Sequence, residues 1–482
     1  MERKRYFIDI AHMHPICPLS LSHARIFVLA DVWARWKRKQ GFSVRFPICM
    51  HYSGSTVFKI VSAVSNFLKN QKLSDSEQKT LDLILNFYKI PKEHLCELNK
   101  PINVLDYFSD VILKDLKSIQ ISCDYDDYFN TDNQLYQEFV RAVFDIYRER
   151  GFITTTNNKK SKSLNYSSPL FRALAVERLN KTTFSPPTAR IMVADSLKNL
   201  DNEWSFERNN SIGTYMDGYF INPMFDSEFF SIFNAIYPYL QNLSIDQSNA
   251  RDIFKEFLYK IENPDKKVSS IANEIYSKSL EILPVDIFFV ERHLQNWVAK
   301  RIYTEAILLP QKFSTKEYFF LGSITVNRKI DSASRGIGIT LSQLIREAGA
   351  INSRMFLLYT FDNHWRDIEW NPIFVKKIRK KTYRFVKFFK LLKIRSTEKN
   401  FNQIFNLLEK AKREIEHNLS RGSTKKVIKI LIEDLPRLIY PLTERQEKID
   451  RSQEKTKEQI LHFFLHYIEI ICPQLLEKLS EK

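Results

Sequence analysis

Two histidines stand where a nucleotide-binding fold would hold a ligand. His23 opens an expected helix after a proline-containing loop, and the free N–H groups of a helix N-terminus favour phosphate. His51, with Ser53 and Gly54, follows the second expected strand, where parallel sheets place their ligand crevice. His23 therefore predicts contact with a phosphate-bearing ligand, and His51 predicts the lining of a ligand pocket. The alternatives are that His23 only caps or packs its helix and that His51 only packs.

The elements around these residues indicate an α/β fold. Residues 5–10 (RYFIDI) are typical of a strand, residues 22–40 of a helix that Gly41 ends, and residues 42–48 (FSVRFPI) of a second strand. Strand, helix and strand form the βαβ unit that opens a parallel sheet. Further along the chain we expect buried strands at 284–290 and 318–326, a loop over 154–170, and helices over 62–151 and from 341 to the end.

A basic helix is expected over residues 376–395, a stretch without any acidic residue. Apolar residues recur there at helical spacing, so one face should pack on a core while lysines and arginines fill the other. The basic face predicts contact with an RNA backbone; a membrane surface and a merely solvated face are the alternatives. The expected RNA-binding residues are Lys376, Lys377, Arg379, Lys380, Lys381 and Arg384.

The composition favours a polyanionic partner in a reducing compartment. The formal net charge is +17, and lysines and arginines that neutralise phosphates release counterions. The five cysteines lie far apart, which predicts neither a zinc site nor a disulfide framework. Asp124, Asp126 and Asp127 match no metal-loop spacing and are interpreted as structural. No apolar run is long enough for a membrane span, so we expect no membrane insertion and a cytoplasmic location.

Five stretches in chain order resemble leucyl-tRNA synthetase of the archaeal and eukaryotic cytosolic type. Residues 18–54 are similar to the opening of that family, in which a His-x-Gly-His turn precedes a helix, a strand and a Phe-His-x-Thr-Gly-Thr-Pro loop. Residues 330–371 resemble its Lys-Met-Ser-Lys-Ser loop with the helix and the Trp that follow. Residues 101–153, 204–221 and 283–298 are similar to segments between them. Ordered blocks indicate common ancestry, whereas one such turn would not.

The resemblance implies a class I synthetase fold, a Rossmann-like parallel sheet with a C-terminal α-helical bundle. Its order places the first half of the catalytic domain, with connective helices, at 1–153 and a short remnant in place of the editing domain at 154–200. The second half of the catalytic domain falls at 201–350 and an anticodon-binding-like bundle at 351–482. The shortness of residues 154–200 implies that editing is absent.

The resemblance also implies roles for individual residues. Catalytic roles fall to His23 and Arg335. Nucleotide-binding roles fall to Ser20, Ser22, His293, Ser332, Ser334 and Gly336. The amino-acid pocket would include His51, Ser53, Gly54, Tyr215 and Tyr219. No metal ligand is implied.

The chain departs from the family at its ATP-contacting elements. Ser22 replaces a glycine that lets adenine pack on the backbone, and Ser20 replaces the first histidine. Ile330 and Ala333 stand where lysines would neutralise pyrophosphate, and Glu291 stands where a glycine is expected. Loss of one preorganised donor commonly costs roughly a hundred- to a thousandfold in rate, so adenylation should be very slow.

The resulting hypothesis is a non-editing leucyl-tRNA synthetase-like paralogue that binds tRNA or an aminoacyl ligand, or a protein partner, with little or no ordinary adenylation. The alternative is an active ATP-dependent leucine-tRNA ligase-type enzyme that works outside protein synthesis on leucine or a similar amino acid. Arg328, Lys329, Arg335 and Arg346 would then supply replacement positive charge. ATP and Mg²⁺ are expected cofactors only for the active enzyme.

Overall fold

The fold is described from a computed structural model of the whole chain. The structure describes residues 4–155, 162–166, 168–200, 203–205, 207–360, 364–396, 400–445 and 451–480. The chain forms two compact units. We call the first, residues 1–17, 41–110 and 123–321, the sheet unit, and the second, residues 18–40, 111–122 and 322–482, the helical unit. The domain boundaries predicted at residues 153, 200 and 350 stay predictions, and part of the predicted remnant lies outside the described residues.

A five-stranded parallel sheet forms the centre of the sheet unit. Its order is β2 (Ser43–Arg45), β1 (Arg5–Ile10), β12 (Ile287–Glu291), β13 (Glu317–Leu321) and β7 (Thr183–Ser185). The apolar runs of β12 and β13 are buried along almost their whole length, as expected for parallel strands covered on both faces. The predicted α/β fold with a parallel sheet is confirmed.

Two of the predicted strands are divided in the structure. Residues 42–48 contribute β2 and a separate strand β3 (Pro47–Met50), which pairs with β4 (Asp124–Asn130) instead of β1. Pro47 has no N–H to donate to a ladder, so the break falls at this residue. Residues 318–326 contribute β13 and then β14 (Ile324–Val326), which begins in the helical unit.

Strand β4 corrects the expectation that residues 62–151 are helical. Asp124 Oδ2 accepts hydrogen bonds from Phe46 N (2.8 Å) and from Arg45 Nη1 (2.9 Å), and Arg45 also pairs with Asp127. These bonds join residues about eighty positions apart in the sequence and hold the segment extended. Asp124 and Asp127 thus both bind Arg45, and within the described part of the chain no group of three or more metal-ligating side chains occurs.

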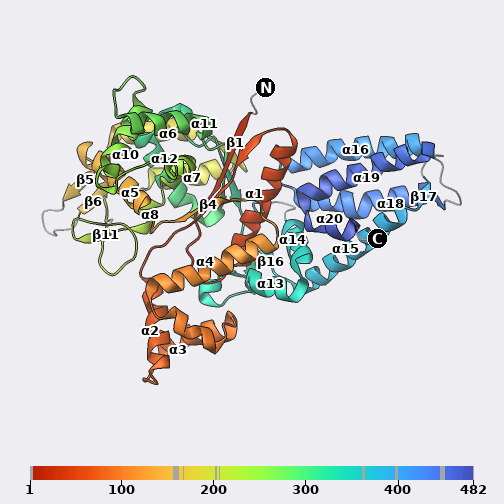
Figure 1. Cartoon of the computed structure of the whole chain (residues 1–482), viewed down its shortest axis with the longest axis horizontal. Helices are drawn as coiled ribbons and strands as arrows, with labels where there is room; N and C mark the ends of the chain where they lie inside the picture. The colour runs from red at the N-terminus through yellow and green to blue at the C-terminus, as the bar shows by residue number, and fades with distance from the viewer. Residues whose placement is uncertain are drawn as a thin grey trace. The chain divides into compact units, whose positions relative to one another are not determined.

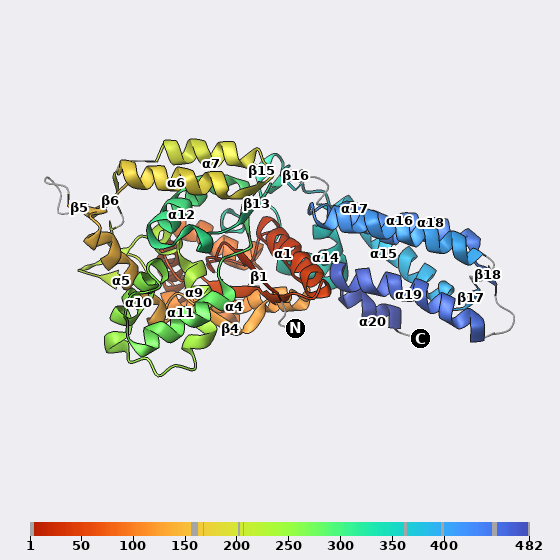
Figure 2. The same ribbon diagram turned by 90° about the horizontal axis from the view of Figure 1, so that it is seen from above.

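Helices and short strands complete the sheet unit. The helices are α2 (Thr56–Leu68), α3 (Asp75–Asp82), α4 (Pro101–Ser118), whose residues from 111 on belong to the helical unit, α5 (Gln134–Glu149), α6 (Pro169–Lys181), α7 (Ala189–Lys198), α8 (Pro223–Asp226), α9 (Phe230–Leu240), α10 (Gln247–Glu262), α11 (Ser270–Ile282) and α12 (Gln295–Leu308). The short strands are β5 (Ile153–Thr155), β6 (Lys162–Asn165), β8 (Glu203–Ser205), β9 (Glu207–Arg208), β10 (Tyr215–Met216) and β11 (Tyr219–Ile221). Figure 2 shows α6 and α7 side by side, and both pack against α12.

The helical unit confirms the expectation that the chain is mainly helical from residue 341. Its helices are α1 (Leu21–Lys39), α13 (Leu341–Ala348), α14 (Ala350–Tyr359), α15 (Pro372–Leu392), α16 (Phe401–Leu419), α17 (Thr424–Lys429), α18 (Leu435–Ile439), α19 (Arg451–Ile471) and α20 (Gln474–Ser480). Its short strands are β14, β15 (Lys329–Ile330), β16 (Ile368–Glu369), β17 (Arg395–Ser396) and β18 (Glu444–Arg445). Figure 1 shows α15, α16 and α19 running alongside one another. None of the described helices has the length and apolar character that a bilayer span requires.

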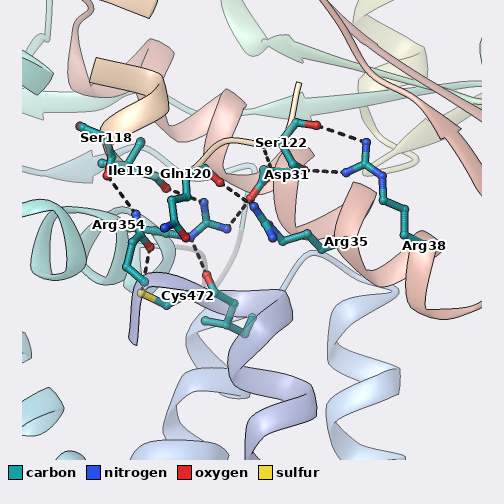
Figure 3. A network of polar contacts seen from close by, with 11 residues as sticks. Asp31, Arg35, Arg38, Ser118, Ile119, Gln120, Ser122, Arg354 and Cys472 are labelled. Atoms are coloured by element: carbon teal, nitrogen blue, oxygen red, sulfur yellow. Dashed lines mark hydrogen bonds and ion pairs between the residues drawn. The ribbon is translucent and has the colours of Figure 1, made fainter. Parts of the chain in front are cut away.

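A buried polar network fixes α1 within the helical unit (Figure 3). Arg354 on α14 donates to the backbone oxygens of Ile471 (2.7 Å) and Ile119 (3.0 Å) and to the carboxylate of Asp31 on α1. Asp31 also accepts from Arg35 Nε (2.9 Å) and from Ser122 N (2.6 Å). Because both Arg354 and Asp31 are fully buried, every donor and acceptor must find a partner there. The network therefore sets the position of α1 and of its N-terminus.

Candidate functional site

The N-terminus of α1 carries three of the predicted nucleotide-site residues. Ser20 is the N-cap, and its Oγ accepts the backbone N–H of His23 at 3.3 Å. The same oxygen lies 3.1 Å from Nδ1 of the His23 ring. Ser20 therefore caps the helix and also orients the imidazole.

Ser22 joins α1 to the loop that follows β14 and β15. Its backbone N–H donates to Asp331 Oδ2 at 3.1 Å, and its hydroxyl accepts the N–H of Ile324 at 2.8 Å. Two N–H groups of the first turn, those of Ser22 and His23, thus bind side-chain oxygens of the chain itself. These are the groups with which a helix N-terminus binds phosphate.

Asp331 lies at the centre of this arrangement. It is only 5% exposed, and burial raises the pKa of its carboxyl to about 6, although the N–H of Ser22 and the charge of His23 act in the opposite direction. Gly338 has a φ of 95° and leaves room for this carboxylate, because a Cβ there would stand 2.1 Å from Asp331 Oδ1. At neutral pH the carboxylate is ionised and places a negative charge at the start of α1.

The other loop residues predicted for the nucleotide site bind one another. Ser332 and Ile337 exchange two backbone hydrogen bonds of 3.0 Å, and Gly336 adopts a left-handed φ of 65°. Ser332 Oγ lies 3.3 Å from Ser334 Oγ and accepts from Arg335 Nε at 3.2 Å. The structure therefore brings the predicted groups at residues 20–23 and 332–336 to one loop and one helix end, through Asp331.

In the sheet unit, His51 is held by a buried carboxylate. Its Nε2 and Asp226 Oδ1 form a hydrogen bond of 2.9 Å, and its backbone oxygen lies 2.9 Å from His14 Nδ1. Burial raises the pKa of Asp226, while the neighbouring His51 lowers it. Burial also lowers the pKa of His14 to about 4, so this ring is neutral at physiological pH.

Ser53 and Gly54 lie beside a second segment that the sequence placed in the amino-acid pocket. Gly54 and Ile212 exchange backbone hydrogen bonds of 3.2 and 3.3 Å, and Gly54 has a φ of 84°. A Cβ on Gly54 would stand 3.6 Å from His14 Nε2, so the loop packs closely on that ring. Ser53 is buried. The structure thus gathers His51, Ser53 and Gly54 with residues 211–213.

The remaining predicted residues of the sheet unit differ in exposure. Tyr215 is half exposed, and its ring packs edge-on against Phe220 with centroids 5.0 Å apart. Tyr219, on the partner strand of this hairpin, is buried. His293 follows the carboxyl end of β12, with its Nε2 3.3 Å from a carboxylate oxygen of the buried Glu291. A carboxylate therefore stands at the sheet edge where the family has a glycine.

Sequence reasoning missed several buried polar residues. Arg301 is buried, donates to Tyr318 Oη (3.1 Å) and lies 4.5 Å above the ring of Phe288. Burial raises the pKa of Glu228 to about 8 and that of Asp9 to about 6. Asp9 was visible as an acid inside an apolar strand, and Asp331 as an acid within a loop that should bind phosphate. The positions of Glu228 and Arg301 carried no comparable signal.

The basic helix α15 presents most of its predicted RNA-binding residues to solvent. Exposed side chains are Lys376, Lys377, Arg379, Lys380 and Arg384. Lys381 differs, because its Nζ pairs with Glu433 (2.9 Å) and donates to Tyr359 Oη (2.7 Å). The predicted apolar face is present, with Phe385, Phe388, Phe389 and Leu392 all buried. Lys381 is therefore held by partners within the protein, and RNA contact by the six residues stays a prediction.

Known proteins resemble this chain at two levels. No family model matches it. Leucine–tRNA ligase 2 of Sulfurisphaera tokodaii is 29% identical over 151 residues, which is 31% of this chain and 15% of the ligase. Leucine–tRNA ligase 1 of Metallosphaera sedula is 28% identical over 155 residues, 32% of this chain and 16% of the ligase. The matched segments thus span about a sixth of these relatives.

The fold likeness covers far more of the chain. Methionyl-tRNA synthetase of Mycobacterium tuberculosis, solved with methionyl-adenylate bound, has a TM-score of 0.66 at 12% identity, over 99% of this chain and 94% of that one. A second structure of that enzyme gives 0.64 at 13% identity. At this identity the likeness shows the fold alone. The chain is therefore a divergent, leucyl-tRNA synthetase-like protein with the fold of a class I synthetase.

Proposed function

We propose that this chain is a non-editing paralogue of leucyl-tRNA synthetase that binds tRNA without adenylating an amino acid at a useful rate. The hydrogen bond between the Ser22 N–H and the Asp331 carboxylate carries the proposal. A helix N-terminus stabilises one anion, and here an ionised side chain of the chain itself occupies that place. An incoming triphosphate would have to displace this carboxylate or lie beside a like charge.

The residues around this helix end do not fit the phosphates of ATP. Ala333 is buried and has no donor, and Ile330 is 42% exposed where a lysine would be expected. Arg335 Nε donates to Ser332 within its own loop. In the sheet unit the buried Glu291 stands at the end of β12, where the resemblance implies a glycine. Catalysis of phosphoryl chemistry depends on preorganised positive charge, which Ile330 and Ala333 do not supply.

The tRNA part of the proposal rests on α15. This helix carries eight lysines and arginines and no acid, and its exposed side chains leave the positive charge on the surface. Counterion release by such a surface gives salt-dependent affinity for RNA without sequence selectivity. A leucine-like aminoacyl group on the tRNA would be met by the loop of His51, Ser53 and Gly54.

A second candidate function is an active ligase that forms an aminoacyl adenylate outside protein synthesis. His23 supports it, because this residue keeps the position of the second family histidine and Ser20 orients its ring. ATP with Mg²⁺ would then bind as a substrate at the N-terminus of α1.

Two measurements test the proposal. Pyrophosphate exchange with each of the twenty amino acids should stay at background, and turnover that disappears in His23→Ala would establish the ligase instead. Filter binding of tRNA should show affinity that falls steeply as salt rises. Binding that is absent at low salt would remove the tRNA part of the proposal.

A further inference from the structure

A small aromatic cavity lies in the helical unit beside the basic helix. Its volume is about 130 Å³, and its lining includes Phe356 and Tyr359 on α14, Trp370 after β16, and Phe374 on α15. The resemblance assigns no role to this cavity. An apolar cavity of about 150 Å³ holds benzene, so this space is close in size to one planar ring.

The four aromatic side chains provide both a floor and an open rim. Phe356 is 4% exposed and packs edge-on against Trp370, with ring centroids 5.1 Å apart. Tyr359 is anchored through its hydroxyl, which accepts from Lys381 Nζ at 2.7 Å. Phe374 is 42% exposed at the rim. A ring that enters from solvent would therefore meet the aromatic side chains that line the cavity.

Positive charge surrounds this rim. Lys377 Nζ lies 5.6 Å from the centre of the Phe374 ring, and Lys425 Nζ lies 5.8 Å from that of Tyr359. Lys376 and Lys380 follow on the exposed side of α15. A nucleic-acid strand that runs along this helix would place its phosphates near these lysines and its bases near the cavity. An apolar protein segment would gain nothing from the lysines.

One acidic residue, Glu369, lines the cavity and would favour a base over a phosphate there. Glu369 is exposed and accepts a hydrogen bond from Thr325 Oγ1 at 2.5 Å, and this bond lowers the pKa of its carboxyl. An ionised carboxylate at the cavity repels phosphate and leaves an acceptor for the N–H groups of a base. The phosphates are thereby directed to the lysines and the ring to the aromatic side chains.

We infer that this cavity binds the base of one unpaired nucleotide in an RNA whose backbone lies along α15. The inference rests on the proposed tRNA binding and specifies where an unstacked base would be held. Single-stranded bases stack on aromatic side chains in this way, with each stack worth roughly 5- to 150-fold in affinity.

A matched pair of RNA hairpins tests the inference. One carries a single unpaired uridine and the other an abasic nucleotide at the same place, so that only the base differs. Fluorescence anisotropy gives the dissociation constants for the full chain. Removal of the base should weaken binding roughly 5- to 150-fold for the unmodified protein, and by little for Phe374→Ala or Trp370→Ala. Trp370→Phe should keep most of the difference.

The outcomes separate the two proposals. Equal binding of both hairpins by the unmodified protein, with affinity that still depends on salt, would overturn the cavity and leave tRNA binding standing. A loss on base removal that persists in Phe374→Ala and Trp370→Ala would place the base elsewhere and also overturn it. No salt-dependent binding of either hairpin would defeat both proposals. Circular dichroism of the variants shows whether the fold is kept, and Phe374→Ala, at an exposed residue, removes least packing.

Discussion

Arg354 and Asp31 form a fully buried ion pair that links α14 to α1. Burial alone would raise the pKa of Asp31, but Arg354 and Arg35 lower it below its usual value. The carboxylate is therefore charged in the folded protein, and the stability it contributes is lost as pH falls through its lowered pKa.

Removal of one partner of this pair should destabilise the protein strongly. Arg354→Met leaves Asp31 charged and buried, and such losses cost about 3–5 kcal/mol. Urea unfolding measures the change. The double variant Arg354→Met with Asp31→Asn should recover part of the loss, because no buried carboxylate is then left without Arg354, whereas additive effects would argue against a coupled pair.

Glu228 should make stability depend on pH in the opposite direction. Its pKa in the folded protein is about 8, above the ordinary value of 4.5, so the folded state binds the proton more tightly. Stability is full below pH 4.5 and falls as pH rises through 8, by up to about 5 kcal/mol. Glu228→Gln keeps an oxygen for Thr304 Oγ1 and should flatten the difference between urea midpoints at pH 5 and pH 9. An unchanged difference would contradict the assignment.

Asp331→Asn should increase anion affinity at the start of α1. The substitution removes the negative charge but keeps an acceptor for the Ser22 N–H. Relief of this repulsion at a helix N-terminus is worth about 1–2 kcal/mol, or roughly 5- to 30-fold in the dissociation constant of pyrophosphate. Calorimetric titration at pH 7.5 measures it. Asp367→Asn is the control, because Asp367 also accepts a backbone N–H, that of Ser323, in the same unit.

Gly322 should not tolerate a side chain. A Cβ there would stand 2.5 Å from the backbone C and O atoms of Arg366, and backbone cannot move aside as a flexible side chain can. Overpacking of this kind costs about 1–3 kcal/mol, so Gly322→Ala should lower the urea midpoint. Gly41→Ala meets no atom within 4 Å and tests the effect of a positive φ alone. Equal decreases of the urea midpoint in Gly322→Ala and Gly41→Ala would show that the structure relieves the contact with Arg366.

Lys380→Gln and Arg384→Gln should each flatten the salt dependence of RNA binding. Both side chains are exposed on α15, and each phosphate contact adds roughly 0.7–0.9 to the slope of log affinity against log salt. Lys381→Gln serves as a comparison, since that lysine is paired with Glu433 and should change the slope little. Filter binding at several salt concentrations gives the slopes.

Local sequence patterns predicted the helices and strands whose structure is set by residues close to them in the sequence. The apolar runs of β12 and β13 identified buried strands, and the proline-containing loop before α1 placed the start of that helix within one residue. Strand β4 was missed because it is held by Arg45, far away in the sequence. Without Arg45 as a known partner, the aspartates of β4 are typical of an exposed segment.

The candidate site was predictable in its residue types but not in its bonds. The resemblance assigned residues 20–23 and 330–336 to one site. The sequence also showed that residues of other types stand there in place of the phosphate-binding side chains of the family. The contact of Ser22 with Asp331 joins positions 309 residues apart, and that of His51 with Asp226 joins positions 175 apart. Only the folded chain shows that the Asp331 carboxylate accepts the N–H of Ser22 at the start of α1.

The two bonds of Ser22 also bear on what a single substitution at this helix end can do. Ser22→Gly would remove a side chain, yet it would leave Asp331 in place and deprive the amide of Ile324 of its acceptor. A change in α1 alone therefore does not free this helix end, and the loop that carries Asp331 would have to change with it.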